Sequence, residues 1–324
     1  MKAIVYDRYG GPEVLRMEEI AKPSPGTGEV LIKVRAAALN PYDWHFMRGT
    51  PYPLRMMAGW RKPKNPRIGV DVAGEVEAVG EKVTNRKPGD AVFGGAPGAF
   101  AEYVCAGEAK LASKPENVSF AEAAGANIAG ITALQALRDK ARVRPGQLVL
   151  VNGAAGGVGT FGVQIAKAFG AQVTGVCSTN KVETVREIGA DAVVDYTKED
   201  FATGEARYDV VLDCVGNRAL TDMQRVLKPG GVYVGAGGTT DNWMMGPLAQ
   251  TIQRILLSQF GRPKLLVIWA KMRREDLAEV GTMMQAGKLK TVLDRQYQLS
   301  EIAEAMRYLE LGHARGKVVV VPEA

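Results

Sequence analysis

The chain has few of the residues from which metal sites and disulfides are built. Its 324 residues include 2 histidines and 3 cysteines, and the cysteines are far apart in the sequence. Disulfide frameworks and cysteine-rich zinc sites need close and regular cysteine spacing. The sequence therefore predicts no metal site, and it predicts reduced, packed thiols at Cys105, Cys177 and Cys214.

Long apolar runs and runs of one charge are also missing. Hydrophobic residues make up 46% and charged residues 23% of the chain, without a stretch typical of a transmembrane helix. The first residues enter a strand pattern directly, without a secretory signal, so we expect a cytoplasmic protein that does not bind membranes. The net charge of +6 is dispersed, which makes a small anion a better partner than nucleic acid.

The hydrophobic pattern changes along the chain. Residues 1–120 contain short strand patterns separated by Gly and Pro, whereas apolar strands alternate with helices over residues 148–238. Apolar strands separated by helices predict a parallel sheet with both faces covered. Residues 290–321 return to a strand, helix and strand. The connection 239–264 has apolar residues at helical spacing, and it predicts an amphipathic helix that packs on its own protein or on a sister subunit.

A glycine-rich loop follows the apolar strand at residues 148–152 and precedes a helical pattern. The loop consists of Gly153, Ala154, Ala155, Gly156, Gly157, Val158 and Gly159. A dinucleotide pyrophosphate needs a tight turn, nearby backbone N–H groups and the positive end of a helix. The strict G-x-G-x-x-G pattern would have glycine where Ala154 stands, but the strand before and the helix after the loop favour cofactor binding. A turn used only for helix–strand packing is the alternative.

The following strand ends without the carboxylate that binds the ribose hydroxyls of NAD. Ser178, Thr179 and Lys181 occur there instead, and hydroxyls with an ammonium can bind a 2′-phosphate. We therefore predict a preference for NADPH. Ser178 is equally suited to cap the next helix, and Tyr196 is expected either beside the adenosine or packed internally. Two later strand ends should pass under the cofactor, at Cys214, Val215, Gly216, Gly235, Ala236 and Gly237.

Motifs along nearly the whole chain carry a family resemblance. They are MKAIVYDRYGGPEVL, PGTGEVLIKVRAAALNPYDWHFMRG, GVDVAGEVEAVG, KPGDAVFG, GAFAEYV, NGAAGGVG and HARGKVVVV. The chain resembles the medium-chain dehydrogenase/reductase superfamily, in its zinc-independent NADPH:quinone oxidoreductase-like branch. The resemblance implies an α/β fold in which a Rossmann doubly wound parallel sheet, residues 123–290, is inserted in a GroES-like β-rich catalytic domain, residues 1–122 and 291–324. A homodimer is common in this family.

The resemblance also shows which metal-ligand positions of the zinc-dependent members differ in this chain. Zinc-dependent members have a cysteine ligand where this chain has Asn40, and a Gly-His-Glu sequence where it has Gly69-Val70-Asp71. Without a Lewis acid an alkoxide is poorly stabilised, whereas quinones and α,β-unsaturated carbonyls delocalise the added charge themselves. The expected activity is metal-free hydride transfer from NADPH to such a conjugated acceptor, bound between the two domains. A zinc-free ketone, alcohol or enoyl reductase, and an NADPH-binding sensor or structural protein without turnover, are the alternatives.

Four residues are candidates for the reaction. Related proteins place an asparagine at Asn40, which would donate a hydrogen bond to the substrate carbonyl or, alternatively, hold the loop as a buried amide. Asp43 is expected to orient its neighbours, and His45 is a candidate proton donor or a structural histidine. Thr132 corresponds to a family threonine near the nicotinamide, or it bonds to its own helical turn.

A basic segment, residues 55–67, is longer than a turn requires. It either covers the substrate or is a solvated loop. Nearby apolar residues are expected to form an adaptable pocket for flat rings or to pack the two insertions. They are Trp44, Met56, Met57, Trp60, Trp243, Met244 and Met245.

Overall fold

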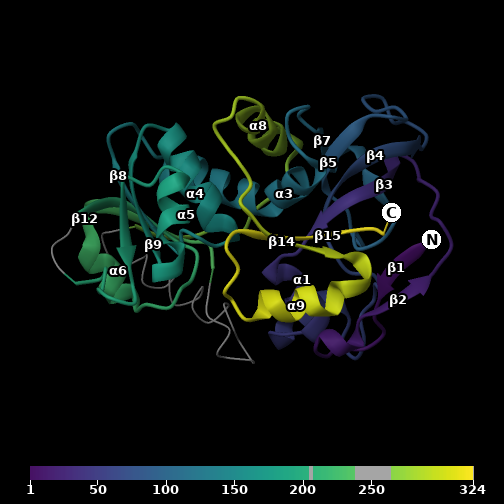
Figure 1. Cartoon of the computed structure of the whole chain (residues 1–324), viewed down its shortest axis with the longest axis horizontal. Coiled ribbons are helices and arrows are strands. Elements are labelled where there is room, and N and C mark those ends of the chain that lie inside the picture. The colour runs from purple at the N-terminus through teal and green to yellow at the C-terminus, as the bar shows by residue number, and fades with distance from the viewer. Residues whose placement is uncertain (204–206, 238–263, 324) are drawn as a thin grey trace. The chain divides into compact units, whose positions relative to one another are not determined.

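The computed structural model describes residues 1–203, 207–237 and 264–323 (Figure 1). The chain forms two compact units. Unit 1 consists of Met1–Ile128, Met272–Gly287 and Thr291–Ala324, and unit 2 consists of Ala129–Lys271 and Lys288–Lys290. The amphipathic helix predicted for residues 239–264 lies outside the described residues, except for Lys264. Among the described helices, none has both the length and the apolar character needed to span a bilayer.

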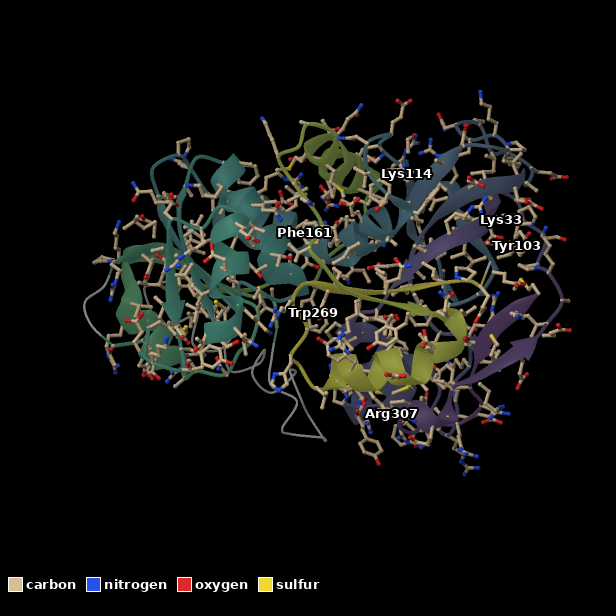
Figure 2. All side chains as sticks on the ribbon, viewed as in Figure 1. Lys33, Tyr103, Lys114, Phe161, Trp269 and Arg307 are labelled. Atoms are coloured by element: carbon tan, nitrogen blue, oxygen red, sulfur yellow. The ribbon has the colours of Figure 1, made fainter. Side chains whose placement is uncertain are left out.

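Unit 1 contains a seven-stranded sheet with the order β14-β15-β3-β4-β5-β7, in which β6 also pairs with β3. Its strands are β3 (Glu29–Ala38), β4 (Asp71–Val79), β5 (Ala91–Gly95), β6 (Tyr103–Gly107), β7 (Leu111–Ser113), β14 (Leu293–Gln298) and β15 (Lys317–Val321). A separate antiparallel pair is formed by β1 (Lys2–Val5) and β2 (Arg16–Glu19). Lys33 and Tyr103, labelled in Figure 2, are register partners on β3 and β6.

The strand register of unit 1 brings three distant parts of the chain together. Ala38, the last residue of β3, pairs with Asp71 at the start of β4. On its other side Ala38 pairs with Val319 of β15. The residues just beyond these pairs therefore meet at one end of the sheet, although they are far apart in the sequence.

Helices complete unit 1. They are α1 (Pro41–Arg48), α2 (Arg55–Ala58), α8 (Arg274–Gln285) and α9 (Ile302–Glu310), with the 3-10 turns η1 (Pro12–Val14), η2 (Tyr52–Leu54), η3 (Glu108–Lys110) and η6 (Leu299–Glu301). The helix α3 (Phe120–Gln135) continues into a π-helical turn, η4 (Ala136–Ala141), and passes from unit 1 into unit 2. Asn40 and Asp43 form a capping box at the start of α1, where Pro41 is the first residue.

Unit 2 contains a six-stranded sheet whose order is β10-β9-β8-β11-β12-β13. The strands are β8 (Leu148–Asn152), β9 (Gln172–Cys177), β10 (Ala192–Asp195), β11 (Tyr208–Asp213), β12 (Leu227–Gly235) and β13 (Lys264–Val267). The helices are α4 (Gly157–Ala168), η5 (Thr179–Lys181), α5 (Val182–Glu187) and α6 (Leu220–Val226). All neighbouring strands are parallel, so the predicted doubly wound sheet is confirmed, and its strand order reverses beside β8.

Candidate functional site

The glycine loop lies between β8 and α4, at the carboxyl edge of the unit 2 sheet. Gly153 adopts φ +80°, which side chains disfavour, and a Cβ on Gly159 would lie 2.0 Å from the carbonyl oxygen of Gly153. Packing therefore requires both glycines. A Cβ on Gly156 would meet Gly153 O only at 3.4 Å, so packing alone does not explain this glycine. Gly156 is the N-cap of α4, where close approach of an anion to the first N–H groups would explain it.

A buried carboxylate organises the neighbouring strand end, and the sequence alone did not identify it. Asp213, the last residue of β11, accepts hydrogen bonds through Oδ1 from the backbone N–H groups of Val215 (3.1 Å) and Gly216 (2.8 Å) and from Asn152 Nδ2 (2.9 Å). Its Oδ2 accepts a hydrogen bond from Tyr233 Oη at 2.7 Å. The carboxylate thus holds the turn after β11 against β8. An acidic residue closing an apolar strand, followed by Cys-Val-Gly, was the available signal.

The predicted residues from the two later strand ends do meet at this edge. Ala236 N–H donates to the carbonyl oxygen of Asp213 at 2.8 Å, and a Cβ on Gly237 would lie 2.2 Å from the carbonyl oxygen of Cys214. Burial raises the pKa of the Cys214 thiol, so this cysteine is not a thiolate at neutral pH. Contact of these residues with a cofactor stays a prediction.

The end of β9 does have a carboxylate beside it, contributed by the adjacent strand β10. Asp195 Oδ2 accepts a hydrogen bond from Thr179 Oγ1 at 2.5 Å, and Oδ1 accepts from Thr197 N and Oγ1 at 3.0 and 2.7 Å. These bonds, the Thr179 hydroxyl first, lower the pKa of Asp195 to about 2. The negative charge is therefore bound by threonine hydroxyls, and Thr179 is engaged with Asp195.

The neighbouring predicted residues are placed differently. Ser178 is the N-cap of η5, but its hydroxyl makes no capping bond and donates to Asn180 Oδ1 at 2.8 Å. The capping role predicted for Ser178 is wrong, because its Oγ accepts no hydrogen bond from the first backbone N–H groups of η5. Tyr196 is 52% exposed, so internal packing does not explain it. Lys181 is the last residue of η5, and Lys198 Nζ lies 3.6 Å from Asp195 Oδ2. Lys198 therefore places a cation at the end of β10, next to the exposed Tyr196.

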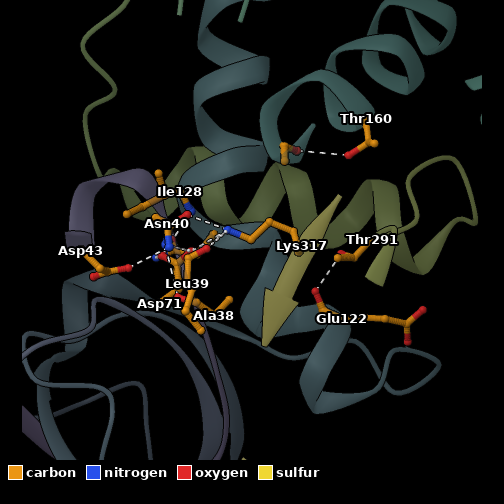
Figure 3. Close-up of polar contacts among 12 residues, drawn as sticks. Ala38, Leu39, Asn40, Asp43, Asp71, Glu122, Ile128, Thr160, Thr291 and Lys317 are labelled. Atoms are coloured by element: carbon orange, nitrogen blue, oxygen red, sulfur yellow. Dashed lines mark hydrogen bonds and ion pairs between the residues drawn. The ribbon is translucent and has the colours of Figure 1, made fainter. Parts of the chain in front are cut away.

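The second polar cluster lies in unit 1, where β3, β4 and β15 meet (Figure 3). Lys317 Nζ donates to Asn40 Oδ1 at 2.6 Å and to the carbonyl oxygen of Leu39 at 3.0 Å. It also lies 3.7 Å from Asp71 Oδ2. Lys317, Asn40 and Asp71 are all buried. The ammonium thus lies among three oxygens inside the protein.

The carboxylate of Asp71 has donors on both oxygens. Oδ2 accepts from Asn40 Nδ2 at 2.9 Å, and Oδ1 accepts from Asn127 Nδ2 at 2.8 Å and from the backbone N–H of Ile128 at 3.4 Å. Burial raises the pKa of Asp71, whereas Lys317 and these donors lower it. An ionised Asp71 paired with Lys317 agrees with this set of donors.

Asn40 uses its amide group inside the cluster. Besides Asp71, its Nδ2 donates to the carbonyl oxygen of Ala38 at 3.3 Å, while its Oδ1 accepts from Lys317. Both amide protons are engaged, so this arrangement favours the buried amide that holds the loop over a hydrogen bond to substrate. Neither Lys317 nor Asn127 was predicted as a site residue. A lysine followed by four valines at the C-terminal strand was the available signal.

Asp43 completes the cluster from α1. Its Oδ2 accepts from the backbone N–H of Asn40 at 2.8 Å, as expected for a residue that orients its neighbours. Its Oδ1 is buried and has no hydrogen-bond partner within the part of the chain that the structure describes. Burial, with a further contribution from the charge of Asp71, raises the pKa of Asp43 to about 8, so the carboxyl group is protonated at neutral pH.

His45 lies on α1, and Thr132 lies on the part of α3 that belongs to unit 2. His45 Nδ1 lies 2.8 Å from the carbonyl oxygen of Thr50, which accepts its proton and leaves Nε2 unprotonated in the neutral ring. Burial lowers the pKa of His45, and the ring stacks on Trp44 with centroids 3.8 Å apart. At neutral pH this histidine is an acceptor at Nε2, which weakens its predicted role as a proton donor. Thr132 is buried.

The basic segment 55–67 exposes large apolar side chains. Met56, Met57 and Trp60 are 74%, 76% and 67% exposed, so they do not pack this loop internally. Arg55 anchors the segment, because its Nε donates to the carbonyl oxygen of Gly49 at 2.9 Å and its guanidinium lies over the Tyr9 ring. Trp243, Met244 and Met245 lie outside the described residues.

Comparison with known proteins identifies the family. The model for the alcohol dehydrogenase GroES-like domain matches residues 26–116, and the model for zinc-binding dehydrogenases matches residues 188–320. The chain is 35% identical to a chloroplastic quinone-oxidoreductase, QR1, of Triphysaria versicolor, over 99% of this chain and 98% of that protein. The chain belongs to the medium-chain dehydrogenase/reductase superfamily, in its quinone oxidoreductase branch.

Two further members of this superfamily are similar along the chain. An NADPH-dependent alkenal/one oxidoreductase of Arabidopsis thaliana is 36% identical over 99% of this chain and 80% of its own length. The solved quinone oxidoreductase of Coxiella burnetii is 32% identical, with a TM-score of 0.85 and 99% coverage of both chains. The predicted family and fold are confirmed.

The zinc named in one family description does not fit the residues of this chain. At the position of the cysteine ligand, Asn40 offers an amide oxygen, and that oxygen already accepts a hydrogen bond from a buried ammonium. Across residues 1–203, 207–237 and 264–323, no group of three or more His, Cys, Asp or Glu side chains is arranged to hold a metal ion. Zinc in catalytic sites takes three nitrogen, sulfur or carboxylate ligands from the protein, and this cluster does not provide them.

Proposed function

We propose that this protein is an oxidoreductase that reduces quinones or α,β-unsaturated carbonyls with NADPH and without a metal. The names of the similar proteins support both the cofactor and the class of acceptor. The observation that carries the metal-free part is Asn40, which stands where zinc-dependent relatives have a cysteine ligand and whose Oδ1 accepts a hydrogen bond from the buried Lys317 ammonium.

The carboxyl edge of the unit 2 sheet fits a dinucleotide. The loop Gly153–Gly159 would hold the pyrophosphate, because Gly156 leaves room at the N-terminus of α4. Tyr196 and Lys181 would bind the adenosine and its 2′-phosphate at the ends of β10 and η5. NADPH supplies a hydride from its nicotinamide ring when it is bound. The turn after β11, fixed by Asp213, would orient that ring.

The acceptor needs less help from the protein than an alcohol would. After hydride addition, the charge of a quinone or an enone is delocalised onto an oxygen, and a proton from water or from a side chain completes the reduction. His45 is neutral and unprotonated at Nε2 at neutral pH. We therefore propose that His45 accepts a hydrogen bond at Nε2 rather than donating a proton. Asn40 and Asp43 hold the loop before α1 and do not contact the acceptor.

We also propose roles for the two domains, an oligomeric state and a cellular location. We propose that unit 1 is the catalytic domain and unit 2 the nucleotide-binding domain; residues 123–128 and 272–287, which the expected bounds gave to the second domain, lie in unit 1. We further propose a homodimer in the cytoplasm. Light scattering after gel filtration and fluorescence microscopy of a tagged chain test these two proposals.

The activity is tested with purified protein and three acceptors: a quinone, a 2-alkenal and a saturated ketone. We expect oxidation of NADPH at 340 nm with the first two, little with the ketone, and no loss of rate in EDTA. NADPH labelled with deuterium at C4 should transfer the label to the β-carbon of the alkenal. Equal rates with the ketone would favour a ketone reductase, and tight NADPH binding without turnover would favour a sensor.

A further inference from the structure

The basic segment 55–67 of unit 1 presents a group of apolar side chains to solvent. Met57, Met56 and Trp60, at 76%, 74% and 67%, are more exposed than any other large hydrophobic side chain within residues 1–203, 207–237 and 264–323. They lie close together in the chain, between residues 56 and 60. Single exposed apolar residues are ordinary, whereas a group of them marks a site of interaction. This group therefore indicates a partner surface.

Positive charge accompanies these apolar side chains. Residues 44–70 contain no aspartate or glutamate. After Trp60 come four cations, which form no salt bridge within the part of the chain that the structure describes. They are Arg61, Lys62, Lys64 and Arg67, of which the first three are exposed. The segment thus offers uncompensated positive charge beside its apolar group.

The backbone of this segment is held in place by unit 1. Tyr9 Oη donates to the carbonyl oxygen of Gly59 at 2.5 Å, and the Lys64 N–H donates to the carbonyl oxygen of Ala58 at 2.7 Å. Gly59 adopts φ +122°, and a Cβ there would lie 2.1 Å from the carbonyl oxygen of Lys62. The turn needs glycine for this shape. The exposed side chains are therefore presented by an ordered turn.

Two kinds of protein partner match the segment poorly. In an isologous contact between two copies the same patch faces itself, so the four cations would face four cations. A groove that binds a helix takes apolar residues over about two helical turns. The helix α2 (Arg55–Ala58) has 4 residues and ends at Gly59, so it does not supply such a face.

A lipid surface matches both features of the segment. Tryptophan is enriched where the hydrocarbon of a bilayer meets water, and Lys and Arg extend their charged ends to that interface while their stems stay apolar. Groups of about four to eight Lys and Arg residues are attracted to anionic lipids. We propose that residues 55–67 dock this protein peripherally on an anionic bilayer, with Met56, Met57 and Trp60 in the interface and the cations at lipid phosphates.

The expectation that this protein does not bind membranes rested on the absence of long apolar runs. Peripheral docking does not require such a run, because a few exposed apolar side chains and nearby cations act together. It is compatible with a cytoplasmic location, since the protein would bind the cytoplasmic face of a membrane. The docking goes beyond the proposed reduction of quinones or unsaturated carbonyls.

The first experiment measures sedimentation of the full chain with lipid vesicles. One set contains phosphatidylcholine alone, and the other contains equal parts of phosphatidylcholine and phosphatidylglycerol. We expect binding to the second set only, about tenfold weaker in about 500 mM than in about 50 mM NaCl, because salt screens the attraction. No binding to the anionic vesicles, or equal binding to both sets, would overturn the proposal.

The second experiment removes two of the cations. Arg61→Gln/Lys62→Gln should bind the anionic vesicles about tenfold more weakly, or weaker still. Lys140→Gln/Arg142→Gln is the matched control, because it removes the same charge from another exposed stretch, and it should bind as the natural protein does. An equal loss in the control would show attraction by net charge alone and would overturn the proposal.

The third experiment tests insertion of the apolar side chains. Lipids brominated on their acyl chains should quench the tryptophan emission of the bound natural protein. Trp60→Leu should keep binding the vesicles and lose most of this quenching. Trp269→Leu is the control, since Trp269 is 64% exposed and lies in unit 2, and its quenching should match that of the natural protein. Unchanged quenching in Trp60→Leu would contradict insertion of this segment.

The triple variant Met56→Ser/Met57→Ser/Trp60→Ser separates docking from other roles of the segment. We expect it to keep the natural Tm, because these side chains are exposed, and to lose vesicle binding. A smaller oligomer in light scattering with unchanged vesicle binding would assign the segment to contacts between copies. A raised KM for the acceptor with unchanged vesicle binding would assign it to covering the substrate. Either result would overturn the proposal.

An acidic polypeptide is the remaining partner that the charge would suit. Binding of polyglutamate by the natural protein, without binding of the anionic vesicles, would assign the segment to such a partner and overturn the lipid proposal. The vesicle, quenching and Tm measurements need no turnover. They therefore remain informative if the proposed activity is not found.

Discussion

The two polar clusters of this chain differ in how their charges are satisfied. In unit 1, Asp71 and Lys317 are buried, and their side chains form hydrogen bonds with Leu39, Asn40 and Asn127. At the carboxyl edge of unit 2, Asp195 is held by threonine hydroxyls, but Tyr196 beside it is exposed and the N-terminus of α4 has room in front of Gly156. The hydrogen bonds of the first cluster stay within unit 1, whereas the second cluster leaves polar and aromatic groups exposed, as the proposed dinucleotide site requires.

We expect the largest loss of folding stability when one charged member of the unit 1 cluster is removed. Asp71→Ala leaves Lys317 as an unpaired buried charge, and breaking such a pair costs about 3–5 kcal/mol. Urea unfolding should show this loss, and Lys317→Met should return part of it in the Asp71→Ala background. A loss below about 1 kcal/mol, the value of a surface pair, would show that the cluster is hydrated.

Asp43 should give unit 1 a characteristic pH dependence. Its pKa is about 8 in the folded protein against an ordinary value of 3.8 for an aspartate, so the folded state binds the extra proton between these two pH values. The stabilisation from this group is complete below pH 3.8 and is lost as the pH rises through 8.

Asp43→Asn removes this dependence. Relative to the natural protein, the variant should gain stability between pH 5 and pH 8, by an amount on the order of a few kcal/mol. Denaturant unfolding at both pH values measures the change. Parallel pH profiles for the two proteins would show that Asp43 is ionised throughout this range.

In unit 2, substitutions in the glycine loop should mainly weaken the binding of NADPH. Gly159→Ala forces a Cβ against Gly153 O, whereas Gly156→Ala meets it only at van der Waals distance. Gly159→Ala should weaken NADPH binding by roughly 100-fold, about 2.7 kcal/mol, and lower the Tm because the loop must open. Gly156→Ala should keep the natural Tm and weaken NADPH binding less. Unchanged affinity in both variants would exclude the loop as the pyrophosphate site.

The smallest expected effect concerns the choice between coenzymes. Lys181→Met should raise the KM for NADPH about tenfold, near 1.4 kcal/mol, with little change for NADH, because only NADPH has the 2′-phosphate. Lys198→Met is the matched control, since Lys198 lies 3.6 Å from Asp195 and its charge is partly balanced. Equal effects of Lys181→Met on both coenzymes would contradict phosphate recognition by this residue.

Much of unit 2 was predictable because its signals are local. Apolar strands, short connections and a glycine loop follow each other in order, and they led directly to the parallel sheet and to the loop at its edge. The carboxylate of Asp195 was missed for the opposite reason. It comes from β10 but contacts the end of β9, so no spacing along one strand could reveal it.

The order of residues was enough to specify the strands, the helix starts and the inserted Rossmann sheet, because apolar periodicity, glycine and proline act within a few residues. The meeting of Asn40, Asp71 and Lys317 required the folded sheet, since Lys317 lies 246 positions after Asp71 and the register of β3 with β4 and β15 joins them. The protonation of Asp43 likewise depends on burial, a property that arises only when the elements pack together.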